Sequence, residues 1–272
     1  MNVTTIVLIP GLWVTALFWE HWVKHYSEKG YNVIAANWPG MDGDIEQLRS
    51  DPGRFATLGL ADVVGHYEQL IRGLETAPVI IGHGVGGLVT QILVDRGWGA
   101  AGVAIASMPP KGVFRSVLRN LKRALNGGSL TPEQFHDEFV NTIAEAPSIA
   151  AFERYVVPAP NRILQQVALA NFSADAPTTV RFHNNSRAAL LLVAGGKDRI
   201  APPSVVKANF DSYRECKAET DYKEYPDQAH FTFLQENKVA DYALGWALCR
   251  VNGSKLTAAA NRTDTWSVEL SA

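Results

Sequence analysis

The sequence predicts an α/β fold in which a mostly parallel central sheet is flanked by helices. Short apolar segments typical of buried strands alternate with longer segments whose apolar residues recur at helical spacing. The chain has 272 residues, of which 47% are hydrophobic and 19% charged, and this balance can fill the core of one large domain. The alternation breaks once, between residues 108 and 187, so we expect an insertion there.

The first half of the chain contains the clearest strand and helix signals. Residues 60–74 place apolar side chains such as Val63 and Tyr67 on one helical face. The run at 79–81 is continuously apolar, as expected for a strand buried in the middle of a parallel sheet. We therefore expect strands at 4–10, 31–36, 79–81 and 102–106, helices at 18–29, 60–74 and 85–96, and a loop at 41–56.

The second half begins with the insertion and then returns to the regular alternation. Residues 108–187 have irregular helical patterns punctuated by prolines and glycines, which indicates an inserted helical subdomain. The last residues are small and polar, as in a loose tail. We expect strands at 188–194 and 221–225 and helices at 204–213 and 239–249, and we divide the chain into a core (1–107 and 188–250), a helical insertion (108–187) and a flexible tail (251–272).

Composition excludes several classes of function. The formal net charge of −2 gives no reason to expect nucleic acid or an anionic membrane as a partner. Cys216 and Cys249 are too few for a disulfide framework and lack metal-ligand spacing, so we expect no metal and no cofactor. The apolar start of the chain fits a core strand better than a signal peptide, and no apolar run is long enough to span a membrane. We expect a cytoplasmic protein with a small-molecule substrate, and a homodimer is the assembly that we consider.

A glycine-rich turn, GHGVGG at 82–87, follows the strand at 79–81 and opens a helix. One site built on such a turn is the dinucleotide fingerprint, which requires an acidic residue after the next strand. Ser-Met-Pro-Pro follows the strand at 102–106 instead. The other is the nucleophile elbow, G-x-S-x-G, in which Gly84 would occupy the position of the serine. An elbow requires an acid and then a histidine, each after a later strand.

Both residues are present in that order. Asp198 follows the strand at 188–194, and His230 follows the strand at 221–225. Together with the turn at Gly84, these motifs resemble those of the α/β-hydrolase-fold superfamily, which includes serine esterases and lyases. The resemblance covers roughly residues 4–249 and implies an α/β-hydrolase fold with a cap or lid at 108–187. Asp227, on the loop of the histidine, is a weaker candidate for the acid.

The resemblance also implies a role for each site residue. His230 would be the general base of a catalytic triad, and Asp198 would orient its ring. The backbone N–H groups of Leu12 and Val85 would form an oxyanion hole, and His83 would be structural. The candidate pocket residues are Trp13, Met108, Phe135 and Phe139.

Gly84 departs from the family pattern, because glycine has no side chain that could form an acyl-enzyme. Two explanations stay open. If the glycine is natural, the His–Asp unit and the oxyanion hole would catalyse hydrolysis, elimination, carbon–carbon cleavage or cyclisation of a small apolar carbonyl compound. If it replaces an engineered-out serine, the parent is an ester or amide hydrolase. The alternative to an enzyme is a non-catalytic ligand-binding protein on the hydrolase fold.

Overall fold

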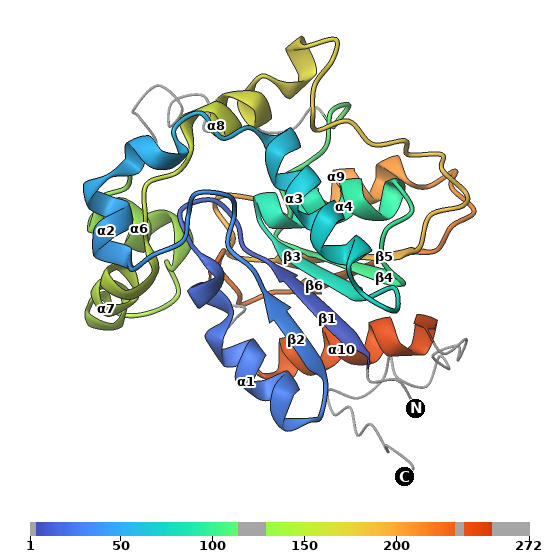
Figure 1. Ribbon diagram of the computed structural model, residues 1–272, viewed down its shortest axis with the longest axis horizontal. Coiled ribbons are helices and arrows are strands. Elements are labelled where there is room, and N and C mark those ends of the chain that lie inside the picture. Colours follow the sequence, from blue (N-terminus) through green and yellow to red (C-terminus); the bar gives the residue numbers. More distant parts are fainter. Residues whose placement is uncertain (1–3, 114–128, 232–236, 252–272) are drawn as a thin grey trace.

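A single parallel sheet organises the molecule. The computed structural model describes residues 4–113, 129–231 and 237–251 (Figure 1). The predicted tail at 251–272 therefore lies outside the described residues except for its first position. The sheet has six strands in the order β2-β1-β3-β4-β5-β6, and every pair is parallel. The predicted fold class is therefore confirmed. The strands are β1 (Thr5–Ile9), β2 (Asn32–Ala35), β3 (Val79–His83), β4 (Ala101–Ile105), β5 (Ala189–Gly195) and β6 (Thr220–Tyr225).

Helices cover both faces of the sheet. Figure 1 shows α1 and α10 on one side and α3, α4 and α9 on the other. Strands β1, β3 and β4 are completely buried between these layers, which explains their continuous apolar sequences. No helix in the described ranges has an apolar stretch of the length needed to cross a membrane. The helices are α1 (Glu20–Glu28, after the 3-10 turn Ala16–Trp19), α3 (Leu60–Arg72), α4 (Val85–Asp95), α9 (Pro203–Ser212) and α10 (Asn237–Val251).

The predicted loop at 41–56 is wrong. The segment contains the helix α2 (Ile45–Ser50) and the 3-10 turn Pro52–Phe55. Asp44 caps α2, because its carboxylate accepts the N–H of Gln47 at 2.7 Å, and Leu48 is completely buried. A helix of this length buries too few apolar residues to give a periodic signal, so tertiary packing decides its conformation.

The insertion between β4 and β5 contains three α-helices in its described part. They are α6 (Pro132–Phe139), α7 (Glu145–Tyr155) and α8 (Asn161–Ala168), followed by the 3-10 turn Ala170–Phe172. Residues 173–188 contain no helix or strand, so the helical character ends earlier than the sequence suggests. The assignment of the whole range to a cap stays a prediction.

Ion pairs attach α7 to the rest of the molecule. Arg154 donates through Nε to Glu20 Oε1 at 2.7 Å, and the Tyr155 hydroxyl donates to the same carboxylate. Arg49 pairs with Glu153 at 2.8 Å on the other side of the helix. The hydrogen bond from Arg154 lowers the pKa of Glu20, against the opposing effect of burial. Such pairs at the surface contribute little stability individually.

Two glycines allow β1, β3 and the start of α4 to pack closely together at the glycine turn. A Cβ on Gly82 would lie 2.0 Å from the carbonyl oxygen of Gly86, and a Cβ on Gly86 would lie 2.2 Å from the carbonyl oxygen of Ile9. Both distances are far inside van der Waals contact with backbone atoms. Strands β1 and β3 and the start of α4 therefore pack together only where these positions have no side chain.

We predict that Gly82→Ala lowers the free energy of unfolding by about 3 kcal/mol or more, because overpacking against fixed backbone cannot be relieved by a side-chain rotation. Urea denaturation measures the change. Gly65→Ala is the matched control: a Cβ on Gly65, inside α3, meets no atom within 4 Å, and alanine favours helix over glycine by up to about 1 kcal/mol. Equal stability of the two variants would contradict the packing explanation.

Candidate active site

Three loops meet at the carboxyl edge of the sheet. Gly84 follows β3, Asp198 lies three residues beyond the end of β5, and His230 lies five residues beyond the end of β6. Because all the strands are parallel, their carboxyl ends share one edge, which is where open α/β sheets bind ligands. The structure thus brings together the three residues that the sequence places far apart.

The turn between β3 and α4 is sharp and has Gly84 at its centre. Strand β3 ends at His83, α4 begins at Val85, and Gly84 has φ 58° and ψ −117°. The N–H of Gly84 donates to the carbonyl of Ile105 at 3.0 Å, and its carbonyl accepts the N–H of Met108 at 2.9 Å. L-residues rarely adopt this backbone conformation, whereas glycine adopts it without a Cβ penalty.

A side chain at position 84 would point at the histidine. A Cβ built on Gly84 lies 3.4 Å from His230 Nε2, and the next neighbour is the Cα of Gly11 at 3.8 Å. These are ordinary van der Waals contacts, unlike those at Gly82 and Gly86. The backbone angle, rather than a lack of space, is what favours glycine at position 84.

His230 and Asp198 form a buried hydrogen-bonded pair. His230 Nδ1 donates to Asp198 Oδ2 at 2.8 Å, and both side chains are at most 5% exposed. The other carboxylate oxygen, Oδ1, accepts the N–H groups of Ile200 at 2.7 Å and Ala201 at 2.8 Å. Since Nδ1 carries the proton in this bond, neutral His230 has its lone pair on Nε2, the nitrogen nearest Gly84.

Backbone contacts between the two loops set the spacing of this pair. Gly196 N–H donates to the Tyr225 carbonyl at 2.9 Å, and Lys197 N–H donates to the Gln228 carbonyl at 3.0 Å. A Cβ on Gly196 would lie 2.3 Å from the carbonyl oxygen of Pro226, so only glycine permits this approach. Asp227, the rival acid, is exposed, and the carboxylate bonded to His230 is that of Asp198.

His83 holds the backbone of His230 in place. Its Nε2–H donates to the His230 carbonyl at 2.8 Å, and the ring is completely buried. Burial, and secondarily the neighbouring His230, hold the pKa of His83 well below its usual range. His83 is therefore neutral with the proton on Nε2, which fits a structural role.

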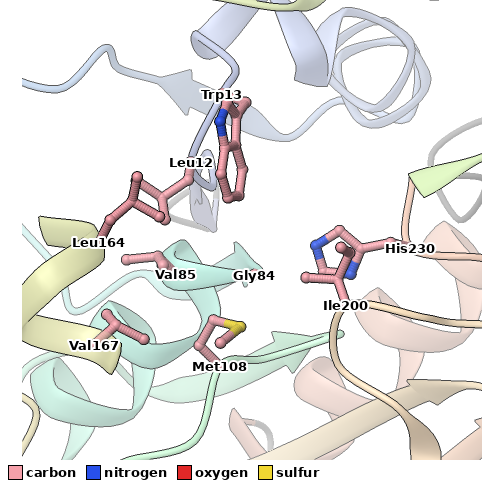
Figure 2. A pocket seen from close by; sticks show the side chains of 9 residues that line it. All are labelled: Leu12, Trp13, Gly84, Val85, Met108, Leu164, Val167, Ile200 and His230. Carbon is pink, nitrogen blue, oxygen red and sulfur yellow. The ribbon is translucent and has the colours of Figure 1, made fainter. Parts of the chain in front are cut away.

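A small apolar cavity opens beside Gly84 and His230 (Figure 2). Its volume of about 20 Å³ is enough for roughly one water-sized occupant. Among the described residues, the amides of Leu12 and Val85 donate to no other residue, and Val85 is the first residue of α4, where the helix dipole is positive. The lining residues are Leu12, Trp13, Gly84, Val85, Met108, Leu164, Val167, Ile200 and His230.

The candidate pocket residues divide into two groups. Trp13 and Met108 line the cavity, whereas Phe135 and Phe139 are not among its lining residues. Both phenylalanines are completely buried. The Phe139 ring lies 5.5 Å from that of His230, and the Phe139 carbonyl accepts the N–H of Phe231 at 2.9 Å. These two side chains therefore pack against the loop of His230 and do not line the cavity.

Sequence reasoning missed three lining residues. Leu164 and Val167 lie three positions apart on α8, so they share a helix face, and that spacing is a signal the sequence contains. Ile200 lies two residues after Asp198, and its own N–H donates to that carboxylate. This hydrogen bond closes a turn after Asp198, and the turn brings Ile200 to the cavity wall.

Two residues next to the site have positive φ angles although they are not glycine. Trp13 has φ 66° and Ala106 has φ 47°. The carbonyl of Trp13 accepts the N–H of Val157 at 2.8 Å, and the N–H of Ala106 donates to the carbonyl of Val193 at 2.8 Å. Each residue is thus held by a distant part of the chain in a conformation that costs of order 1–3 kcal/mol. Across the described ranges, no three His, Cys, Asp or Glu side chains gather as metal ligands.

Comparisons with known proteins agree with the fold. The model of the family described as "Alpha/beta hydrolase family" matches residues 6–242, while curated protein sequences gave no match. Among solved structures, polyneuridine aldehyde esterase superposes with a TM-score of 0.64 at 14% identity, covering 90% of this chain and 100% of that one. An esterase from Thermogutta terrifontis superposes with a TM-score of 0.65 at 16% identity, covering 92% of this chain and 91% of that one. A third structure is an alanine variant of tomato methylketone synthase I complexed with beta-ketoheptanoate. It superposes with a TM-score of 0.64 at 11% identity, covering 92% of this chain and 100% of that one.

We predict that Gly84→Ser lowers the thermal midpoint. A serine at these backbone angles carries strain of order 1–3 kcal/mol, and the ordinary contacts of its Cβ with His230 and Gly11 offset little of this strain. Differential scanning calorimetry measures the shift. Gly97→Ser is the matched control, because Gly97 has φ 90° and a Cβ there meets nothing within 4 Å. A midpoint for Gly84→Ser that equals or exceeds that of the unchanged protein would refute the strain argument.

Proposed function

The chain belongs to the alpha/beta hydrolase family, whose members are mostly enzymes, and from this premise we propose that it is an enzyme in which His230 acts as a general base without a covalent intermediate. Its substrate is a small apolar carbonyl compound. The observation that carries the proposal is the position of His230 Nε2, 3.4 Å from where a side chain of residue 84 would begin, with Nδ1 bonded to Asp198.

The base has the features that proton transfer requires. A general base must lie within hydrogen-bond reach of the proton that it removes, and His230 is one of the residues that line the cavity. Asp198 fixes the tautomer and would stabilise the imidazolium that forms. Because Asp198 is itself held by two backbone amides, the pair can keep its geometry while the proton moves.

The lining of the cavity argues against a different covalent nucleophile. Among the described residues that line it, His230 is the only one with a titratable side chain, and none is Ser, Thr or Cys. Ser107, in the loop after β4, donates through Oγ to the Met108 carbonyl and accepts from Gln91 at 2.8 Å, and it does not line the cavity. Acyl transfer through a side-chain hydroxyl or thiol therefore has no candidate group there.

The backbone supplies the complementary part of the chemistry. Leu12 and Val85 line the cavity, and backbone amides such as theirs would stabilise negative charge that develops on a carbonyl oxygen in a site of low dielectric. The dipole of α4 adds to this effect. An enolate, or the oxyanion formed by addition to a carbonyl, is the species that this arrangement favours.

The structural neighbours support a carbonyl substrate. Two of those compared are named esterases, and the third was solved with a β-keto acid. Two reactions fit the proposed base: attack of water on an ester, with His230 removing the proton from water, and proton transfer during carbon–carbon cleavage of a ketone-bearing compound. Gly84 also favours a second candidate, a ligand-binding protein without turnover, since the family's nucleophile position lacks a side chain.

We predict that His230→Ala reduces turnover by about 100-fold or more, the range found when a general base is removed, while ligand affinity changes little. Asp198→Asn should reduce turnover as well, because the ring loses its orienting carboxylate. Activity is measured on short-chain nitrophenyl esters and on a short β-keto acid, and affinity by calorimetry with a non-reactive ketone.

Asp227→Asn is the matched control, because this exposed carboxylate lies on the loop of His230 without being its partner. It should retain full activity. Unchanged turnover in His230→Ala would eliminate the proposed base. Absence of turnover in the unchanged protein, with binding indifferent to His230, would favour the ligand-binding candidate.

Gly84→Ser separates the two origins of the glycine. If the parent is a serine hydrolase, we expect the serine to restore esterase activity on a nitrophenyl ester with a covalent acyl-enzyme, detectable as a burst of nitrophenol. If the glycine is natural, the variant should show no such burst. The outcome is read as the stopped-flow absorbance of released nitrophenolate, with Gly97→Ser as the folded control.

A further inference from the structure

We infer that three buried polar side chains hold the proposed oxyanion donor, the N–H of Val85, in its orientation. The three are Tyr213, Gln91 and Ser107, and they act through the backbone of Met108. None of the three is among the residues that line the cavity, so they are positioning residues rather than catalytic ones. This inference rests on the proposed function, and it goes further by giving a role to side chains that the proposed chemistry does not use.

The three side chains form one directed chain of hydrogen bonds. The hydroxyl of Tyr213, directly after α9, donates to Gln91 Oε1 at 3.0 Å. Gln91 Nε2, on α4, donates to Ser107 Oγ at 2.8 Å, and Ser107 Oγ donates to the Met108 carbonyl at 2.9 Å. The three residues are at most 3% exposed. A buried polar network of this kind is rigid when its members are satisfied, so the chain can fix the backbone at its end.

The sequence around the chain makes room for it. Gly87 lies one turn before Gln91 on α4, so the two positions share a helix face. A Cβ on Gly87 would lie 2.9 Å from the Cβ of Ser107, and a side chain there would displace the serine. At the other end, the Phe182 ring packs edge-on against Tyr213 at 5.0 Å. Burial raises the pKa of the Tyr213 hydroxyl, which therefore keeps its proton and donates it.

Met108 connects the chain to the glycine turn. Its N–H donates to the Gly84 carbonyl at 2.9 Å, a shorter bond than the 3.3 Å bond from the N–H of Leu88 to the same oxygen. The Gly84 carbonyl and the Val85 N–H belong to one planar trans peptide group, so they point in opposite directions. The position of the Met108 amide therefore helps to set the direction of the Val85 N–H.

The turn that contains Ser107 needs support from outside itself. Ala106 has φ 47°, a conformation that costs energy in a residue other than glycine. The same turn holds Gly84 on its other side, because the carbonyl of Ile105 accepts the N–H of Gly84 at 3.0 Å. Loss of the Ser107 hydroxyl would release the Met108 carbonyl and let the strained turn relax, with a change in the orientation of the peptide group after Gly84.

We expect Ser107→Ala to lower kcat at least about ten-fold while KM changes less than about two-fold. Negative charge on the substrate oxygen develops only in the transition state, so a misaligned donor weakens that state and not substrate binding. Removal of a whole oxyanion donor costs about 100- to 1000-fold in kcat, and a misaligned one costs part of that. Turnover is measured on the substrates used for His230→Ala.

Tyr26→Phe is the matched control, because Tyr26 is completely buried and its hydroxyl donates to the Ala240 carbonyl at 2.8 Å. It lies on α1, which covers the opposite face of the sheet from α4 (Figure 1). The control should keep its kcat although it loses a buried hydrogen bond, and the thermal midpoints of both variants are compared. Native kcat in Ser107→Ala, or an equal loss of kcat in the control, would overturn the inference.

Gln91→Glu gives a second test, with a readout that a merely structural role would not move. A protonated carboxyl has the shape of the amide, and it can donate to Ser107 and accept from Tyr213 as the amide does. An ionised carboxylate can only accept. The single hydroxyl proton of Ser107 then turns toward position 91 and leaves the Met108 carbonyl, so ionisation breaks the chain at its last bond.

The activity of Gln91→Glu should therefore depend on pH in a predictable direction. Burial raises the pKa of a carboxyl at this position. Asp95, one turn further along α4, acts in the same direction, and Arg187, which lies over the Tyr213 ring, opposes it. We expect the kcat of the variant, divided by that of the native protein at the same pH, to fall as the pH rises from about 5 to about 9, where buried carboxyls titrate. A constant ratio would overturn the inference, and Ser107→Ala decides if this variant does not fold.

Nuclear magnetic resonance of isotope-labelled Gln91→Glu separates failure of this inference from failure of the proposed function. The amide signals of Val85 and Met108 should move with the titration of the introduced carboxyl beyond any movement in the native protein, and unmoved signals would overturn the inference. If they move but His230→Ala retains all activity, the proposed function fails and the positioning stands. If His230→Ala abolishes turnover while Ser107→Ala keeps native kcat, this inference fails and the proposed function stands.

Discussion

The buried hydrogen bond between Asp198 and His230 is the interaction on which the site depends. A carboxylate is costly to bury unless its oxygens are hydrogen-bonded, and here one oxygen accepts two backbone amides and the other accepts the imidazole. His83 completes the arrangement by holding the carbonyl of His230. The ring is thus fixed at both its nitrogen and its backbone, so Nε2 has a defined position relative to Gly84 without any contribution from a substrate.

The parallel sheet brings the loops of Asp198 and His230 to one edge, and glycines allow the chain segments there to approach closely. Strands β3, β5 and β6 end at one edge, so their loops converge. Gly82, Gly86 and Gly196 are needed because any Cβ would collide with backbone. Gly84 differs from these three, since a side chain fits there and only the φ angle opposes it. The turn at 82–87 therefore contains glycines of two kinds: Gly82 and Gly86, which the packing requires, and Gly84, where there is room for a side chain.

The sequence was sufficient for the parallel sheet and for the order of the residues at its carboxyl edge, because buried strands and the turns after them leave local patterns. It was not sufficient for features that arise from distant contacts. The helix α2 is too short to show periodicity and depends on the burial of Leu48. Phe135 and Phe139 look like pocket residues by their aromatic character, yet the contact of Phe139 with Phe231 places them behind the histidine. Leu164 and Val167 reach the cavity only because α8 folds back over the sheet edge.

The left-handed conformations of Trp13 and Ala106 have a consequence for how the protein can evolve. Trp13 lines the cavity and Ala106 lies two residues before Met108, which also lines it, and each residue has a strained backbone that the surrounding structure restrains. Glycine at position 106 would release that energy at the expense of one methyl group, whereas at position 13 the loss of a buried indole packed on Phe139 would cost more than the strain that it relieves. Of the two, only position 106 can therefore exchange local strain for resistance to heat.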